Sequence, residues 1–150
     1  MVYEKYSRQS LPSKEYRELL GSAICVFNSN NSFVIENILR NDVTGRYNWH
    51  ELIDYTSGEL SEPVKKTITQ NSNTVIARKF NEIIEIRNRI MHSFQVTAPK
   101  GKGISDDKDN QILATKYKDG KQAYITKEFL YDFIEKNDVL SSELHKFRGY

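Results

Sequence analysis

The stretch from residue 74 to residue 94 constrains the fold most, because it has the pattern of one long amphipathic helix. At about 100° per residue, its apolar side chains fall on one broad side and most of its polar side chains fall on the other. The first side carries Val75, Ile76, Lys79, Phe80, Ile83, Ile84, Ile86, Ile90, Met91 and Phe94. We therefore expect the rest of the chain to be organised around this helix.

Arg87 breaks this pattern, since it lies near the middle of the apolar side. Burying a guanidinium without a partner costs a large amount of free energy. We therefore expect Arg87 either to be paired inside the fold or to face a cleft or a subunit interface. His92 follows five residues later, about 140° round an ideal helix. The two side chains could contact one small ligand only if the helix ended near His92 or a second subunit supplied one of them.

The N-terminal half predicts further helices after an arm at residues 1–12. Ser13 is expected to cap the first of them, and the polar run at 28–32 leaves open whether that helix is interrupted. Asn48 has the spacing of a capping box and opens a helix, with Trp49 expected in the core. Another short helix is expected to start at 61–63, where a proline lies near the first helical position.

The C-terminal third contains the only signal for strands. Residues 98–110 are polar and rich in lysine, glycine and aspartate, so they predict a flexible loop. Asp119-Gly120 separates two β-prone runs and predicts a hairpin at about 111–125. Thr126 is expected to cap the last helix. The sum is a helical bundle with one small hairpin before its C-terminal helix.

Composition indicates a soluble globular protein with one domain spanning 1–150. The net charge of +2 neither requires nucleic acid nor excludes a local basic patch. No apolar run approaches the roughly 20 residues needed to cross a bilayer, and no apolar signal core is present at the start. A reducing cytoplasm is therefore the expected location, with no membrane partner. The single cysteine, Cys25, lies in an apolar run and is expected to be buried.

The order Arg87-Asn88-x-x-x-His92 resembles the R-x-x-x-x-H signature of the HEPN family, in which a polar residue is preferred directly after the arginine. The isoleucine-rich helix before the histidine and the expected helix end after it fit the family as well. The resemblance implies an all-α fold, a HEPN-like helical bundle. It also implies a metal-independent endoribonuclease, used as a toxin or defence effector, in which two copies line one cleft with two arginines and two histidines.

These residue types suit RNA cleavage without a cofactor. A histidine can move protons near neutral pH, and an arginine pairs with phosphate oxygens while keeping its charge. Asn88 precedes His92 by four residues, so it could orient the imidazole or hold the substrate. Arg87, Asn88 and His92 are therefore the catalytic candidates. The candidates for substrate binding are Arg89, Lys100 and Lys102, although a solvated loop is the more common role for the segment that holds the two lysines.

Other interpretations remain open at this point. Arg87 could form a buried salt bridge with a carboxylate of another helix, with His92 merely capping the helix end. The chain could be a non-catalytic HEPN-type module that binds nucleotide, RNA or a protein, or a helical assembly subunit without a ligand. His50 and His145 have no partner at a recognisable spacing, so surface or capping roles are expected for both.

The resemblance also bears on the partners. Beyond RNA and a second copy of the chain, it implies an antitoxin or another regulatory protein. Some HEPN toxins paired with nucleotidyltransferase antitoxins carry a tyrosine two residues after the histidine, and that tyrosine is modified. Phe94 occupies the position here, so regulation by that modification is in doubt and an antitoxin of another kind is left open.

Overall fold

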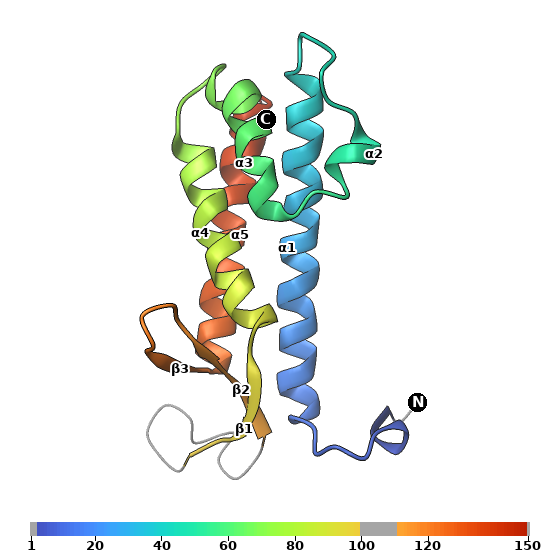
Figure 1. Cartoon of the computed structure of the whole chain (residues 1–150), viewed down its shortest axis with the longest axis vertical. Helices are drawn as coiled ribbons and strands as arrows, with labels where there is room; N and C mark the ends of the chain where they lie inside the picture. Colours follow the sequence, from blue (N-terminus) through green and yellow to red (C-terminus); the bar gives the residue numbers. More distant parts are fainter. Residues whose placement is uncertain (1–2, 100–110, 150) are drawn as a thin grey trace.

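The computed structural model describes residues 3–99 and 111–149. Its three long helices, α1 (Lys14–Arg40), α4 (Val75–Met91) and α5 (Lys127–Phe147), lie side by side (Figure 1). α5 packs against both α1 and α4, and the apolar sides of all three share one continuous core. The large side chains that are fully buried there include Tyr16, Phe27, Phe80, Phe133, Ile35, Ile38 and Ile83. The expectation of a mostly helical bundle around residues 74–94 is confirmed.

The short elements cover the end of the bundle opposite to a small sheet (Figure 1). They are α2 (Trp49–Leu52), η2 (Ser57–Leu60), α3 (Ser61–Val64) and the π-helical turn η3 (Lys65–Thr69). The N-terminal turn η1 (Tyr3–Tyr6) lies instead at the end that carries the sheet (Figure 1). Leu52, Leu60 and Val64 bury their side chains in the core. The helix expected to start at 61–63 is thus present, and the 3-10 turn at Ser57–Leu60 directly precedes it.

The helix starts follow local hydrogen bonds, as expected. The Ser13 hydroxyl accepts from the Tyr16 N–H at 3.1 Å, and the Thr126 hydroxyl accepts from the Phe129 N–H at 3.1 Å. Asn48 caps α2 in the same way. These bonds satisfy backbone donors that have no partner within the helix.

α1 runs through the polar segment 28–32 without interruption. Asn30 is buried there, and its amide group donates to the backbone oxygen and the side-chain oxygen of Asn137 on α5, at 2.8 and 2.9 Å. The Asn137 amide in turn donates to the Phe133 carbonyl at 2.8 Å. A buried polar side chain that is fully hydrogen bonded costs little, so this contact between helices overrides the weak helix propensity of the asparagines.

The expected hairpin is confirmed, and a third strand joins it. β2 (Gln111–Lys116) pairs with β3 (Gln122–Ile125), and β1 (Phe94–Thr97) pairs antiparallel with the other edge of β2. Gly120 has a φ of +90°, the left-handed conformation that glycine adopts without strain. The prediction that Phe94 belongs to the helix is wrong, because α4 ends at Met91 and Phe94 pairs with Ala114.

Two further burial predictions are wrong. Cys25 is exposed, because the buried positions of α1 run through Ala23 and Phe27, on another side of the helix. Trp49 is 50% exposed, because α2 is only one turn long and places Leu52 in the core instead. His50 and His145 are both exposed, as expected, and the His50 ring meets the Trp49 ring edge to face.

Tyr16 connects the first helix to the sheet. Its side chain is fully buried, and its hydroxyl donates to the Ile125 carbonyl at 2.6 Å. The same oxygen accepts from the Leu113 N–H at 3.1 Å. One hydroxyl therefore satisfies a backbone group on each of two neighbouring strands, at the end of the sheet that faces α1.

We expect Tyr16→Phe to lower the free energy of unfolding by roughly 1–3 kcal/mol, because a buried carbonyl and a buried N–H lose their partner. Urea denaturation followed by circular dichroism measures this change. Tyr131→Phe is the matched control, since Tyr131 is exposed on α5, and it should leave the midpoint unchanged. Equal midpoints for both variants would contradict this role of Tyr16.

Candidate functional site around Arg87

Arg87 lies in the second-last turn of α4 and is half-buried. Its guanidinium carbon is 5.5 Å from the centre of the Phe27 ring on α1. Phe27 is itself buried and stacks on Phe133 of α5, with ring centres 6.1 Å apart. The charge is therefore seated on an aromatic platform in the core, an arrangement that attracts a cation to the ring face.

No carboxylate of the described residues forms an ion pair with Arg87, so the predicted alternative of a buried salt bridge is wrong for this part of the chain. Among the described residues, the guanidinium donates only to the neighbouring Asn88 side-chain oxygen, at 3.2 Å. Glu82, one turn away, pairs with Lys136 on α5 at 3.0 Å, and this hydrogen bond raises the pKa of Lys136. A half-buried cation without an acidic partner attracts an anionic ligand.

A pocket of about 410 Å³ opens beside Arg87. Polar side chains of α1 form one wall, and the segment between α2 and η2 forms another. Its lining consists of Phe27, Asn28, Asn31, Ser32, Ile53, Tyr55, Thr56, Ser57 and Arg87. None of these is acidic, and the amides and hydroxyls can donate to anionic oxygens. The Ser57 hydroxyl donates to the Asn31 side-chain oxygen at 2.9 Å, which ties the two walls together.

His92 is the C-terminal cap of α4 and is exposed. Its backbone N–H donates to the Asn88 carbonyl at 2.9 Å. Its imidazole forms no hydrogen bond or ion pair within the described ranges, and the Asn88 side chain contacts Arg87 instead. The structure therefore brings Asn88 to Arg87, and it leaves His92 on another side of the helix, as the spacing predicts for a single chain.

The three residues expected to bind substrate are placed differently. Arg89 is half-buried and donates to the Lys116 carbonyl at 2.6 Å, so it contacts the start of the hairpin turn rather than the Arg87 pocket. Lys100 and Lys102 lie outside the described residues. Among the described residues that line the Arg87 pocket, Arg87 itself is therefore the only basic one.

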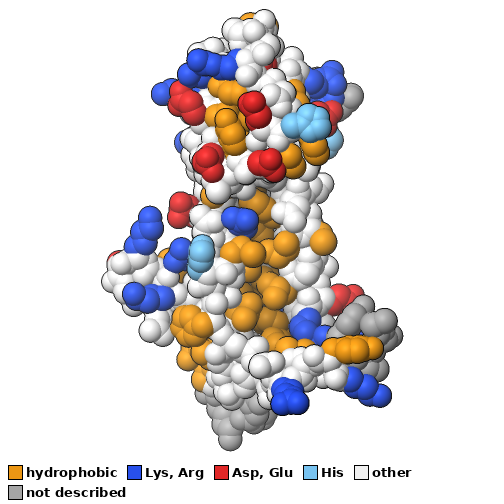
Figure 2. Space-filling model, turned by 45° about the vertical axis from the view of Figure 1, so that its right-hand side comes forward, with side chains coloured by type: hydrophobic (Ala, Val, Ile, Leu, Met, Phe, Trp, Pro, Cys, Tyr) orange, Lys and Arg blue, Asp and Glu red, His pale blue; other side chains and the backbone are white. Residues whose placement is uncertain are grey.

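One face of the molecule carries an apolar hollow (Figure 2). Figure 2 shows hydrophobic side chains along the hollow, acidic side chains gathered above it and basic side chains beside and below it. Met91, one turn after Arg87, is 55% exposed, and Ile53 at the mouth of the pocket is also exposed. Exposed apolar surface of this kind beside a charged site is typical of an interaction surface.

Several of the pocket residues could not be identified from the sequence. Asn28, Asn31 and Ser32 belong to the polar run for which the sequence left open whether the first helix is interrupted. The sequence did contain a signal for these residues. A run of asparagines and serines disfavours a helix, so a helix that contains such a run is expected to use the polar side chains in tertiary contacts. The described residues contain no group of three or more His, Cys, Asp or Glu that could hold a metal ion, and none of their helices could span a membrane.

We expect Arg87→Met to lower the free energy of unfolding by no more than about 1 kcal/mol, because the fold loses a cation–π contact and no ion pair. Arg148→Met is the matched control. Arg148 also lies over a ring, that of Phe33 at 5.4 Å, but it pairs with Glu36 at 2.9 Å, so its loss should be larger. Urea denaturation compares the two. A loss of roughly 3–5 kcal/mol for Arg87→Met would indicate a structural ion pair.

Comparison with known proteins gives no information about this site. No protein-family model, no curated protein and no solved structure matches the chain. The HEPN resemblance therefore rests on Arg87, Asn88 and His92 and their setting alone. The function of the site has to be inferred from the chemistry of its own side chains.

Proposed function

We propose that this protein is a metal-independent endoribonuclease of HEPN type, whose active site forms between two copies of the chain. The observation that carries the proposal is the setting of Arg87: a half-buried guanidinium on Phe27, without a carboxylate partner in the described ranges, at a pocket lined by amides and hydroxyls. Such a group is suited to hold a phosphodiester.

The phosphodiester explains both the charge and the polarity of the pocket. A guanidinium can donate two parallel hydrogen bonds to phosphate oxygens, and it keeps its charge throughout the reaction. Asn88 holds the guanidinium in place from the side at 3.2 Å. Asn28 and Asn31 of α1 lie opposite and can donate to the remaining oxygens or to the ribose.

A second copy supplies the histidine chemistry that one chain lacks. His92 is exposed at the end of α4, and Met91 beside it offers apolar surface on the side of the helix that carries Arg87. A twofold arrangement that buries this surface places two Arg87–His92 pairs in one cleft, since a twofold interface uses the same patch on both copies.

The proposed reaction needs one base and one acid. One His92 takes the proton from the ribose 2′-hydroxyl, and the 2′-oxygen forms a new bond to phosphorus. The bond from phosphorus to the 5′-oxygen breaks, and the His92 of the second copy gives that oxygen a proton. Arg87 stabilises the charge that develops on the phosphorane oxygens. The products carry a 2′,3′-cyclic phosphate and a free 5′-hydroxyl.

A non-catalytic module that binds RNA, a nucleotide or a protein is the second candidate. It is favoured by one observation: the Arg87 pocket is complete within a single chain, whereas His92 lies elsewhere on the helix. A chain that holds a phosphate in this pocket without pairing would bind and not cleave.

We expect the wild-type protein to cleave mixed cellular RNA in EDTA and to leave cyclic phosphate or 3′-phosphate ends. His92→Ala and Arg87→Met should each reduce the rate at least about 100-fold, because each removes a group that acts in the transition state. His50→Ala is the control, since His50 is exposed on α2, and it should cleave normally. Gel analysis and end-labelling measure the products. Loss of wild-type cleavage in EDTA, or unchanged cleavage by His92→Ala, would contradict the mechanism.

We also expect the protein to be a dimer in solution, and we expect Met91→Asp to shift it to monomer and to reduce cleavage in parallel. Sedimentation velocity gives the mass, and the same preparations give the rate. Val43→Asp places the same charge at a site that is 95% exposed and should change neither. A monomeric wild type that cleaves RNA would rule out a site shared between copies.

A further inference from the structure

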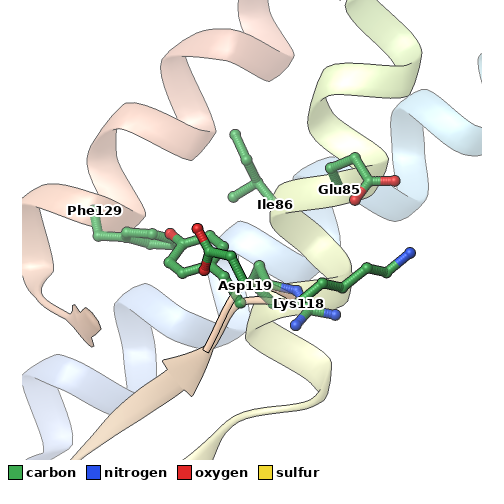
Figure 3. Close-up of a pocket in the computed structure, with 7 residues that line it drawn as sticks. Glu85, Ile86, Lys118, Asp119 and Phe129 are labelled. Atoms are coloured by element: carbon green, nitrogen blue, oxygen red, sulfur yellow. The ribbon is translucent and has the colours of Figure 1, made fainter. Parts of the chain in front are cut away.

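A second pocket, of about 380 Å³, lies between α4, the hairpin turn and the first turn of α5. Figure 3 shows Phe129 reaching from α5 toward α4, Ile86 on α4, and Asp119 and Lys118 on the turn, with the Lys118 side chain pointing away from Phe129. Its lining consists of Glu85, Ile86, Arg89, Tyr117, Lys118, Asp119 and Phe129. The volume lies within the range of small-molecule sites.

This pocket is separate from the Arg87 pocket. Glu85 and Arg89 are four residues apart and share one side of α4, whereas Arg87 lies about 160° round the helix from either. No residue lines both pockets. A ligand here would therefore contact neither the Phe27 platform nor the walls formed by α1.

The apolar part of the pocket suits a flat ring. Tyr117 lines the pocket from the hairpin turn, Phe129 lines it from α5, and Ile86 lines it from α4. Nucleobases stack on such side chains in many single-strand binding sites. An aliphatic chain would also be accepted by these three residues, so the charged residues decide the class of ligand.

The charged residues provide both acceptors and donors. Glu85 is exposed, and its carboxylate has no hydrogen bond or ion pair within residues 3–99 and 111–149. Asp119 already accepts from the Lys121 N–H at 3.0 Å. Arg89 uses one N–H for the Lys116 carbonyl, and its other N–H groups form no hydrogen bond or ion pair with the described residues. Lys118 adds a second cation on the side of Glu85, away from Phe129 (Figure 3).

Guanine matches this set better than the other bases. Its N1–H and 2-amino group form a pair of parallel donors that one carboxylate can accept. Its O6 and N7 are acceptors that arginine and lysine bind bidentately. Adenine and cytosine offer a carboxylate only an exocyclic amino group, and uracil offers only a ring N–H. Two carboxylates and two cations also balance in charge, which fits a neutral ring rather than a bare phosphate.

We propose that this pocket binds a guanine base, with the ring against Tyr117 and Phe129, the Glu85 carboxylate on its donor edge, and Arg89 or Lys118 on its acceptor edge. The base can belong to an RNA strand or to a free nucleoside or nucleotide, since the chemistry is shared. The inference goes beyond the proposed ribonuclease activity, because it requires neither Arg87 nor His92.

Calorimetric titration with guanosine, inosine and adenosine tests the proposal. Inosine lacks only the 2-amino group, so it should bind about tenfold more weakly than guanosine, and adenosine more weakly still. Glu85→Gln should lower guanosine affinity about tenfold and reduce the preference over inosine. Glu135→Gln, an exposed glutamate on α5, is the control. Tyr117→Leu should weaken all three nucleosides, whereas Tyr131→Leu should not. Equal affinity for guanosine and inosine would overturn the assignment of guanine.

Two arms identify the source of the base. 5′-GMP represents the free nucleotide, and a single-stranded RNA pentamer with guanine or inosine at its centre represents the strand. A preference for the guanine pentamer without detectable guanosine binding supports a base read within RNA, and binding of guanosine or 5′-GMP supports a free ligand. No guanine preference in either arm overturns the proposal. Arg87→Met should bind guanosine as the wild type does, because Arg87 does not line this pocket. Failure of the proposed ribonuclease activity and failure of guanine binding can therefore be told apart.

Discussion

The contact between Arg87 and Phe27 is the constraint on which the candidate site depends. α4 must bury its apolar side against α1 and α5, and Arg87 lies on that side. The Arg87 guanidinium lies over the face of the Phe27 ring, and stacking on Phe133 fixes that ring. One side of Arg87 remains open to a polar pocket. A carboxylate partner would have made the same arginine a structural residue, because its charge would then be neutralised within the fold.

The end of α4 is the second determinant. The helix stops at Met91, and the chain turns at His92 directly into β1, which is held by its ladder to β2. The turn exposes the imidazole, and Tyr16 anchors the sheet to α1 through two hydrogen bonds. A sheet fixed in this way also fixes the hairpin turn against α4. The sheet therefore positions His92 through β1, and it positions the second pocket through the turn between β2 and β3.

α4 thus presents two kinds of chemistry from one rigid element. On one side, Arg87 offers a guanidinium that has no carboxylate partner among the described residues, beside hydrogen-bond donors of the pocket walls, and this combination suits a phosphate. On the opposite side, α4 supplies Glu85 and Arg89 to a pocket whose aromatic rings come from the hairpin turn and α5, and this combination suits a base. A nucleic acid contains both groups, and a strand that crossed the end of α4 could place a phosphate and a base on their respective sides. The two proposals are nevertheless tested by different variants and different ligands.

Much of this could be predicted from the sequence. Local patterns determined the long amphipathic helix, the caps at Ser13 and Thr126, the hairpin around Gly120 and the conflict posed by Arg87, because each depends on neighbours within a few residues. Tertiary structure alone decided that α1 continues through 28–32, since Asn30 needs Asn137 on α5. It also decided that Phe94 joins a strand, that Cys25 and Trp49 are exposed, and that Asn28, Asn31 and Tyr55 meet at Arg87. These outcomes depend on partners distant in sequence, and periodicity within one segment carries no information about them.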